Sequence, residues 1–549
     1  MGVPRLYNTL RPLASSAVLE NETVVIDGPA LAYHILSICR ANGVAHPSYR
    51  LLGQIAVSWL ERLSLSNIHV RSIFFDGYLP PSKLEIRVDR MMTNTSRLCR
   101  LYELFPQRCP TFLLQMHQAQ ADIDLFKAHA RNAYPTIDPS FLVPAVLDAL
   151  RESDRYRAVT HLVPGEADHF CASDVSHHGG IILTSDSDLL VHDLGHGRVM
   201  FFRDLQQDAQ SKLEFVCFSP RQLFEQLGLR YPELAVRLAY EQKCSPRANL
   251  AQLVKTSAQT TQCTSRFLAF QKEYASTEPL SFRQTWAGFE MGATRGLDPR
   301  ISEIILDFHL KLRKGAAGLP VRMFLPPLLE RPTSKSAWDQ STAIRQLAYS
   351  LLSYCTDNEI MVSSVQEYRR VQNLNCTGRR VELMQQKVAE QYMHQVLLCA
   401  AELETLSSDL CDLFWIGLAI LLDKVESQRQ DTASTAEQLH RFLRSQESVQ
   451  PNEGASWMVV HGTAQLHGAL YSLRILQQVL LVVGDSQMDQ AFPLEKTRAL
   501  LSRITPLERY PQTAEMVQIA QKLQDMGMNN LIDSICAKLP DANHGPEKA

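Results

Sequence analysis

The amino-acid sequence predicts an α/β fold for about the first 250 of its 549 residues and a mostly α-helical fold for the remainder. In the first part, short apolar runs rich in β-branched residues alternate with stretches of helical periodicity, an order typical of a parallel central sheet with crossover helices. From about residue 250, apolar residues recur at intervals of three and four instead of two. We therefore expect one domain at 1–250, an α-helical domain at 251–539 and a flexible tail at 540–549.

Four strands and four helices are predicted in the first part. Each strand is an apolar run that stops at a polar turn or at the start of a helix. The strands are expected at 23–26, 72–75, 158–163 and 180–184, and the helices at about 30–39, 51–63, 166–176 and 220–227.

A long polar insert at about 82–150 interrupts this alternation. Its beginning is the most basic stretch near the predicted strand ends, and a solvated helical face is the alternative explanation of that charge. The cations are Lys83, Arg87, Arg90, Arg97 and Arg100, against the acids Glu85 and Asp89.

The second part contains long apolar stripes at helical spacing. One stripe comprises Val381, Met384, Val388, Tyr392, Val396 and Cys399, and another comprises Leu466, Leu470, Leu473, Leu476, Leu480 and Val483. Four arginines of this part are candidate phosphate contacts, although charge runs on helices are more often solvated faces. They are Arg369, Arg370, Arg379 and Arg380.

The composition excludes several classes of protein. Apolar residues make up 45% of the chain and charged residues 21%, which excludes a disordered or fibrous protein, and the apolar runs are too short to cross a bilayer. No two of the 12 cysteines lie closer together than Cys99 and Cys109, so neither a zinc site nor a disulfide scaffold is expected. The N-terminus lacks the apolar segment of an export signal, and we expect a reducing compartment, the nucleus or the cytoplasm.

The charge balance gives no general sign of nucleic-acid binding. Lys and Arg number 55 and Asp and Glu number 58, a formal net charge of -3. Binding to nucleic acid would therefore depend on local basic patches.

Acidic residues gather where the predicted strands end. Because the carboxyl ends of parallel strands share one edge of a sheet, these side chains are expected to lie together. Each has an ordinary alternative: Asp-Gly is a common turn, acids favour the first turn of a helix, and Ser-Asp pairs cap helices. The residues are Asp27, Asp76, Glu166, Asp168, Asp186 and Asp188.

Taken together, the acids point to bound cations. Clustered carboxylates repel one another unless cations neutralise them, and oxygen ligands without His or Cys favour Mg²⁺ or Mn²⁺ over zinc. Two such ions about 4 Å apart can activate a water molecule and stabilise the leaving oxygen of a phosphodiester. The pattern therefore predicts a nuclease.

Several motifs in order resemble the flap-endonuclease/XPG superfamily, whose catalytic core is a PIN-like domain. They are Met-Gly-Val-Pro-Arg-Leu at 1–6, Val-Ile-Asp-Gly at 25–28, Phe-Asp-Gly at 75–77, Pro-Gly-Glu-Ala-Asp at 164–168 and Leu-Thr-Ser-Asp-Ser-Asp at 183–188. Within the superfamily the chain looks most like the Asteroid branch, over about residues 1–245. The resemblance implies that the six acids are metal ligands or outer-shell carboxylates, that Glu241 replaces the last aspartate of the pattern, and that the insert is a helical arch.

The resemblance also assigns roles outside the acidic cluster. It implies that Lys83 and Arg90 are the basic pair that contacts the scissile phosphate. Tyr33 would stack a base, Arg87 in the same basic stretch would bind nucleic acid, and the processed amino terminus at Gly2 would lie near the substrate. The alternative for Tyr33 is a core position on a helix.

The chain departs from the family after Glu241, where the glycines of the usual helix-two-turn-helix element are missing. The leading hypothesis is a metal-dependent endonuclease, a hydrolase with two Mg²⁺ or Mn²⁺ ions. It would act on flap, junction-containing or single-stranded DNA, or on RNA, in nuclear DNA repair. The alternative is a weak or inactive nuclease fold that recruits protein partners through its helical half in repair, signalling or post-transcriptional control.

Overall fold

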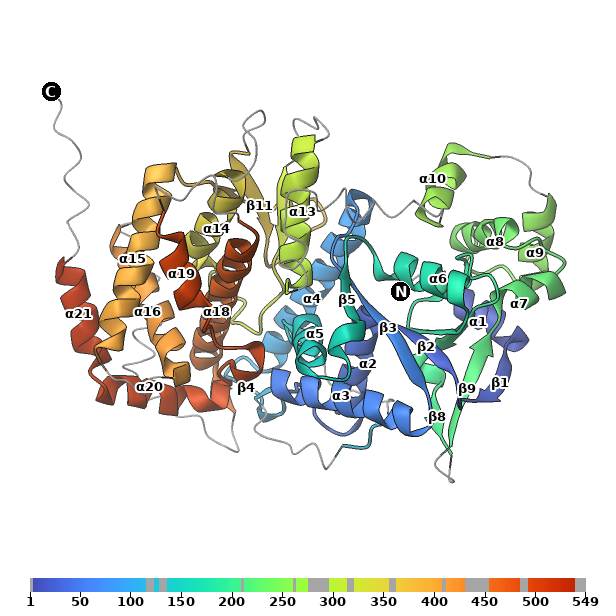
Figure 1. Cartoon of the computed structure of the whole chain (residues 1–549), viewed down its shortest axis with the longest axis horizontal. Coiled ribbons are helices and arrows are strands. Elements are labelled where there is room, and N and C mark those ends of the chain that lie inside the picture. Colours follow the sequence, from blue (N-terminus) through green and yellow to red (C-terminus); the bar gives the residue numbers. More distant parts are fainter. Residues whose placement is uncertain are drawn as a thin grey trace.

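A mixed β-sheet forms the centre of the first half of the chain (Figure 1). The computed structural model describes residues 3–114, 123–127, 136–208, 212–259, 263–274, 296–313, 320–354, 362–406, 411–429, 454–483 and 492–538. The sheet has the strand order β1-β9-β7-β6-β2-β3-β5, with β8 paired to β9. The strands are β1 (Ser15–Val18), β2 (Thr23–Asp27), β3 (His69–Asp76), β5 (Thr160–Val163), β6 (Ile181–Thr184), β7 (Arg198–Phe201), β8 (Gln206–Gln207) and β9 (Leu213–Phe218).

The prediction of a parallel sheet is correct for only part of this sheet. Strands β7, β6, β2, β3 and β5 are parallel neighbours, and they include all four predicted strands. Strand β9 runs antiparallel to β7, β1 and β8. A short connection suffices between antiparallel strands, whereas parallel strands need a longer crossover. Between β7 and β9, the described residues 202–208 and 212 form a single 3-10 turn and the short strand β8 in place of a crossover helix, in keeping with an antiparallel return that makes the sheet mixed.

Helices cover both faces of the sheet. Along β2, Val24 and Ile26 pack into the core on one face and Val25 into the core on the other, as alternation along a strand requires. On the first face lie α2 (Gly28–Ala41), α3 (Tyr49–Leu65) and α5 (Leu142–Glu152), and on the second lie α1 (Leu6–Leu10), α6 (Ala167–His178), α7 (Pro220–Gln226) and α8 (Glu233–Cys244). The predicted helices at 30–39, 51–63, 166–176 and 220–227 correspond to α2, α3, α6 and α7.

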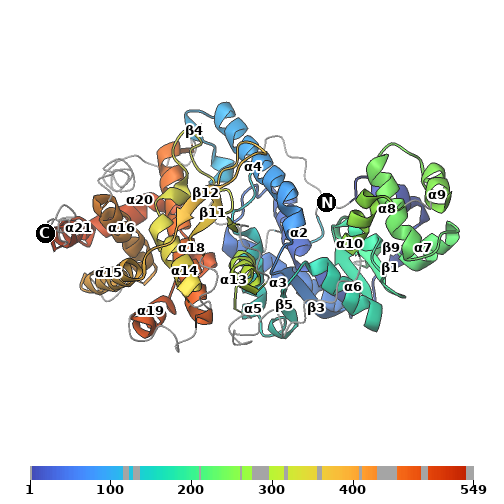
Figure 2. The same ribbon diagram turned by 90° about the horizontal axis from the view of Figure 1, so that it is seen from above.

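Two helices beyond residue 250 extend the core on the second face. They are α9 (Leu250–Gln259) and α10 (Ser265–Tyr274), which lie beside α8 (Figures 1 and 2). Leu253 of α9 and Phe267 and Phe270 of α10 belong to the same hydrophobic cluster as the sheet residue Val25. Within the described residues, the helices therefore pack on the core of the first half of the chain as far as Tyr274.

The predicted insert begins with the long helix α4 (Leu84–Leu104), which runs from near α2 towards β4 (Figure 2). Its buried residues are spaced by three and four, at Val88, Met91, Thr95, Leu98 and Leu101. This face packs against the second half of the chain, and strand β4 (Arg108–Cys109) pairs with β13 (Ala455–Ser456). The end of the predicted insert, by contrast, is α5, which packs on α2 and α3.

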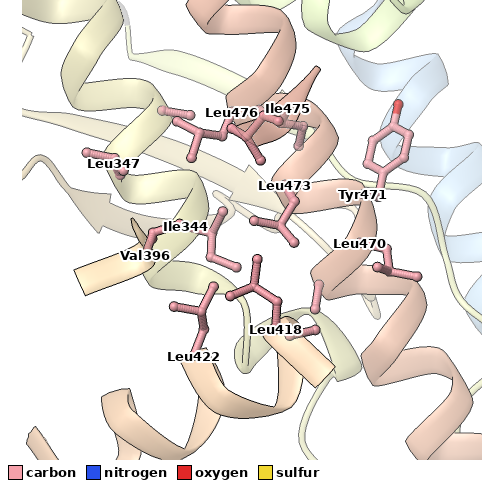
Figure 3. Packing of buried hydrophobic residues seen from close by; sticks show 14 of the residues in the cluster. Ile344, Leu347, Val396, Leu418, Leu422, Leu470, Tyr471, Leu473, Ile475 and Leu476 are labelled. Carbon is pink, nitrogen blue, oxygen red and sulfur yellow. The ribbon is translucent and has the colours of Figure 1, made fainter. Parts of the chain in front are cut away.

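Helices surround a central, almost fully buried helix in the second half (Figure 3). The helices are α13 (Pro299–Arg313), α14 (Thr342–Tyr354), α15 (Gln386–Glu404), α16 (Cys411–Arg429), α18 (Trp457–Val482), α19 (Leu494–Leu501), α20 (Met516–Asp525) and α21 (Met528–Lys538), with α18 at the centre. Side chains of α18, among them Leu470, Leu473 and Leu476, meet those of α14, α15 and α16 (Figure 3). This confirms the predicted stripe that contains these leucines. None of the helices in the described ranges combines the length and apolarity needed to cross a membrane.

The second half also contains a small sheet that the sequence did not predict. Strands β10 (Val321–Phe324), β11 (Ser364–Tyr368) and β12 (Arg379–Glu382) form it, with β10 and β11 parallel and β11 and β12 antiparallel. Val381, assigned from its spacing to a helical stripe, is the buried residue of β12. The predicted helical stripe is therefore wrong at Val381, because strands of four or five residues contain too few repeats to reveal their period. The predicted tail at 540–549 lies outside the described residues.

A buried ion-pair network joins the two halves. Arg474 of α18 donates to both carboxylate oxygens of Asp298, just before α13, at 2.9 and 2.6 Å. It also donates to Asp148 of α5 at 2.8 Å. Nearby, the rings of Phe141 and Tyr471 stack with centroids 4.3 Å apart. A charged side chain of the second half therefore fixes the position of a helix of the first.

Replacing Arg474 is expected to destabilise the whole chain. Arg474→Ala should lower the free energy of unfolding by about 3–5 kcal/mol, because it leaves the fully buried Asp298 without its counter-charge. Urea denaturation measures the loss. Arg503→Ala is the matched control, since Arg503 and its partner Glu404 are exposed, and it should cost less than about 1 kcal/mol. Equal losses in the two variants would contradict the assignment.

Candidate active site

The ends of three neighbouring strands place acidic residues at one edge of the sheet. Asp27 is the last residue of β2 and Asp76 the last of β3, while Asp186 follows the end of β6 by two residues. The strand order β6-β2-β3 and their parallel pairing put these three positions side by side. The structure therefore brings together acids that the sequence assigned to this edge.

Three further acids approach the same edge. The chain leaves β5 next to β3, and Glu166 and Asp168 occupy the first residues at the start of α6. Asp188 lies two residues after Asp186, in the short helix η6 (Ser187–Leu190). Six of the seven predicted metal ligands thus converge from four segments of the chain.

The glycines after Asp27 and Asp76 are required by close packing. A Cβ atom on Gly28 would lie 2.6 Å from the ring of Phe75, and one on Gly77 would lie 2.3 Å from the carbonyl oxygen of Val163. Gly28 is also the first residue of α2, with Asp27 as its N-cap, so the expected turn after β2 is the start of a helix. The lack of a side chain at Gly28 and Gly77 therefore allows the ends of β2 and β3 to pack closely against neighbouring segments of the chain.

Hydrogen bonds orient the carboxylates. The hydroxyl of Thr184 donates to Asp27 at 2.7 Å, and the same hydroxyl accepts the backbone N–H of Asp186 at 2.9 Å. Asp76 accepts the backbone N–H of Ala167 at 2.7 Å, so it caps α6 from a neighbouring strand. The backbone N–H of Val3 donates to Asp188 at 2.6 Å. These contacts leave part of the hydrogen-bonding capacity of each carboxylate for another partner.

Burial and the proximity of like charges raise the pKa values of several acids in this cluster. Burial, followed by a net effect of neighbouring acids, raises the pKa of Asp76 from 3.8 to about 7, with Asp27 and Glu166 among the neighbours responsible. Burial also raises the pKa of Asp27 and of Asp188 to about 6. For Asp168, burial and then the charge of Asp27 raise the pKa well above its usual range.

Lys83 contacts this cluster directly. Its Nζ lies 3.2 Å from a carboxylate oxygen of Glu166. Burial lowers the pKa of Lys83, but the ion pair with Glu166 outweighs this effect and the pKa is raised. Lys83 therefore stays charged and lies where a phosphate bound at the edge would need a counter-charge.

The other predicted nucleic-acid contacts differ in their surroundings. Arg90 is exposed on α4 and exerts its charge on Tyr33, whose side chain on α2 is 46% exposed. A core position for Tyr33 is therefore wrong. Arg87 forms a double ion pair with Glu303 of α13, and its guanidinium lies 3.8 Å from the ring centroid of Phe324. Arg87 thus joins α4 to the second half, and Gly2 lies outside the described residues.

Glu241 is paired with an arginine of its own helix. It is on α8, and its carboxylate accepts a hydrogen bond from Arg237, one turn earlier, at 3.0 Å. The charges that act most strongly on Asp27, Asp76, Asp168 and Asp188 do not include Glu241. Its role as a seventh ligand stays a prediction.

The donor set fits Mg²⁺ or Mn²⁺ in chemistry. The six acids at the edge offer only carboxylate oxygens, the ligands that hard divalent cations prefer. Burial first, and then the charges of neighbouring acids, raise the pKa values of four of them, so a bound cation would stabilise their ionised forms. In the part of the chain that the structure describes, however, no three Asp, Glu, His or Cys side chains are arranged closely enough to hold one ion. Binding would therefore require side-chain adjustment.

The site thus combines acids at one edge of a sheet, a lysine paired with one of them and an exposed aromatic side chain, and these features can be compared with known families. Residues 138–383 match the family described as XPG domain containing. The match includes Glu166, Asp168, Asp186, Asp188 and Glu241 and extends through α13 and β12 into the second half. None of the curated proteins compared with the chain matches it.

The XPG match supports the predicted resemblance to the flap-endonuclease/XPG superfamily. A domain of this family suggests nucleic-acid binding and nuclease activity in general terms. The match begins at residue 138 and therefore does not include Asp27 and Asp76. These two residues lie at the same edge of the sheet as the matched acids.

Sequence reasoning missed several residues of this site. Thr184 stands inside the recognised 183–188 motif, at the end of a predicted strand and two residues before Asp186, and that position was the signal that could have found it. Glu303 acts on Asp76 and Tyr274 bonds to Asp188 from helices far along the chain. No local pattern marks either residue, because their approach depends on how α13 and α10 pack.

Stability should depend on pH through these acids. The folded state holds protons on Asp27, Asp76, Asp168 and Asp188 more tightly than the unfolded state, because their pKa values are raised. Stability is therefore lost as the pH rises through the folded-state values. In a chelating buffer, the melting temperature should fall as the pH rises from about 5 to about 7, between the ordinary aspartate pKa of 3.8 and the folded-state values of about 6 and about 7.

Asp168→Asn should flatten this decline, because it removes one titrating group and one repelling charge. The same substitution at the exposed Asp154, whose side chain is 99% accessible, should leave the decline unchanged. Thermal unfolding followed by circular dichroism at several pH values measures both. A decline of the same slope in Asp168→Asn would show that the acids do not interact as described.

Proposed function

We propose that the protein is a divalent-metal-dependent, structure-specific nuclease that hydrolyses phosphodiester bonds. The observation that carries the proposal is the convergence of six carboxylates at one edge of the sheet, where four of them have raised pKa values. Such a cluster costs free energy unless cations bind it. The XPG match of residues 138–383 supports the same class of activity.

The metals that the donor set favours are Mg²⁺ and Mn²⁺. Asp27, Asp76, Asp168, Asp186 and Asp188 would hold them, with Glu166 shared between the ions and Lys83. Two bound ions would supply an activated water molecule and a counter-charge for the leaving oxygen. The hydrogen bonds from Thr184, Ala167 and Val3 hold the carboxylates in position, which reduces the reorganisation needed on binding.

The chain's own cations and aromatics would handle the nucleic acid. Lys83 and Arg90 would bind the phosphate to be cleaved, and Tyr33, exposed beside Arg90, would stack a base. Base stacking requires an unpaired nucleotide, which favours flap, junction or single-stranded DNA, or RNA. We further propose an Asteroid-like role in DNA repair in the nucleus, with the helical half as a surface for protein partners.

A scaffold without strong catalysis is the second candidate. The ion pair between Glu241 and Arg237 favours this candidate, because the arginine occupies the carboxylate that would complete the family's set of metal ligands. In that case the XPG-like fold would bind nucleic acid or protein partners without cutting. The two functions differ in whether the acids are needed for cleavage.

Cleavage should depend on the acids at the sheet edge. With Mg²⁺ or Mn²⁺, the wild type should cut flap, splayed-arm or single-stranded substrates, and Asp76→Ala and Asp186→Ala should each lower the rate by about 100-fold or more. Gel assays of labelled substrates measure the rate, and Asp154→Asn is the exposed control. Wild-type cleavage no faster than that of the two alanine variants would leave the scaffold as the function.

Arg90 and Arg87, three residues apart on α4, should respond differently to substitution. The double variant Lys83→Ala, Arg90→Ala should cut at least about tenfold more slowly, because it removes charges that face the substrate, while its loss of stability should be limited to about 1 kcal/mol from the partly exposed Lys83–Glu166 pair. Arg87→Ala should instead lower the free energy of unfolding by about 2–4 kcal/mol, because it leaves Glu303 unpaired at the contact between the halves. Equal rates in the double variant and the wild type would exclude Lys83 and Arg90 from the reaction.

A further inference from the structure

Tyr274 brings a hydroxyl group to the acidic edge from outside the predicted catalytic domain. It is the last residue of α10, and its hydroxyl lies within hydrogen-bonding reach of the carboxylate of Asp188. The preceding residue, Glu273, exerts its charge on Lys83. The end of α10 therefore lies between an acid and the lysine of the candidate site.

The ring of Tyr274 is held by aromatic neighbours. Its centroid lies 5.4 Å from that of His192 and 4.9 Å from that of Phe270. His192 in turn meets His169 of α6 edge-on, with centroids 5.0 Å apart. Tyr274 thus contacts both its own helix and residues that flank the acids, so its hydroxyl has a defined position.

The whole of α10 is docked on α8 by aromatic contacts. Phe267 and Phe270 lie 5.3 and 5.5 Å from the ring of Tyr240 of α8, measured between centroids. The guanidinium of Arg237 lies 4.4 Å above Phe267, and the ammonium of Lys243 lies 5.0 Å from Phe270. This packing is independent of the acids, and it delivers Tyr274 to Asp188 without using them.

We propose that Tyr274 is a positioning residue that orients Asp188 for cation binding. Asp188 already accepts the backbone N–H of Val3 at 2.6 Å, and Tyr274 adds a second donor. An ionised carboxylate has about four acceptor sites, so two donors restrict its rotation and leave capacity for a cation. Such outer donors hold a ligand in one orientation and commonly change metal affinity by about 10–100-fold.

This inference rests on the proposed function, because it assumes that Asp188 binds a metal ion. It adds a residue that acts through Asp188 and has no direct part in the reaction. It also implies that α10, beyond the predicted domain limit at residue 250, is part of the metal site.

Tyr274→Phe tests the inference, because it removes the hydroxyl and keeps the ring. The dissociation constant for Mn²⁺, measured by calorimetry on the full chain at fixed pH, should rise about tenfold or more. The metal-free melting temperature should stay within a few degrees of the wild type. Tyr240→Phe is the control, since it keeps its ring contacts with α10 and does not touch the acids.

A second background separates positioning from general damage. In Asp188→Asn, the further change Tyr274→Phe should have no effect on Mn²⁺ affinity, because the group through which it acts is gone. Cleavage by Tyr274→Phe should recover towards the wild-type rate at high Mn²⁺, whereas cleavage by Asp188→Asn should not.

The outcomes are distinct. An Mn²⁺ affinity in Tyr274→Phe within about twofold of the wild type, or an equal loss in the Asp188→Asn background, overturns the positioning role. Failure of the wild type to bind Mn²⁺ overturns both this inference and the metal-dependent nuclease. Binding with the expected Tyr274 effect but without cleavage supports the inference and rejects the nuclease alone.

Discussion

Repulsion among carboxylates at adjacent strand ends is the constraint on which the first half of the structure depends. A parallel sheet brings Asp27, Asp76 and Asp186 to one edge, and the start of α6 adds two more acids. The fold tolerates this because Thr184 and several backbone N–H groups donate to the carboxylates, and because glycines allow the strand ends to pack closely. The raised pKa values reflect first the burial of these carboxylates and then the repulsion that remains among them.

The acidic site draws on separate parts of the chain. The segment before the first strand supplies the N–H of Val3, the sheet supplies the acids, and α10 supplies Tyr274. The second half approaches through α13, where Glu303 influences Asp76 and pairs with Arg87. Folding of the sheet alone therefore does not complete the site.

Much of the first half could be predicted from the sequence, because its strands are buried apolar runs that end in acids. The same rule placed six acids together, since residues that end parallel strands must meet. Short antiparallel strands such as β8 and the small sheet around Val381 escaped prediction, because four residues carry little periodic signal. The place of Arg87 was hidden for another reason: sequence shows that a residue is charged, but packing decides whether its partner is a phosphate or Glu303.

Helix α4 has one side that packs on the second half and another that carries exposed cations such as Arg90. Arg87 meets Glu303, 216 positions away, and Phe105 accepts a hydrogen bond from Trp457, 352 positions away. Substitutions on the packed side of α4 are therefore constrained by distant partners, whereas those on the exposed side are not. In related chains, the packed positions should co-vary with α13 and α18, while the exposed positions should drift or adapt independently.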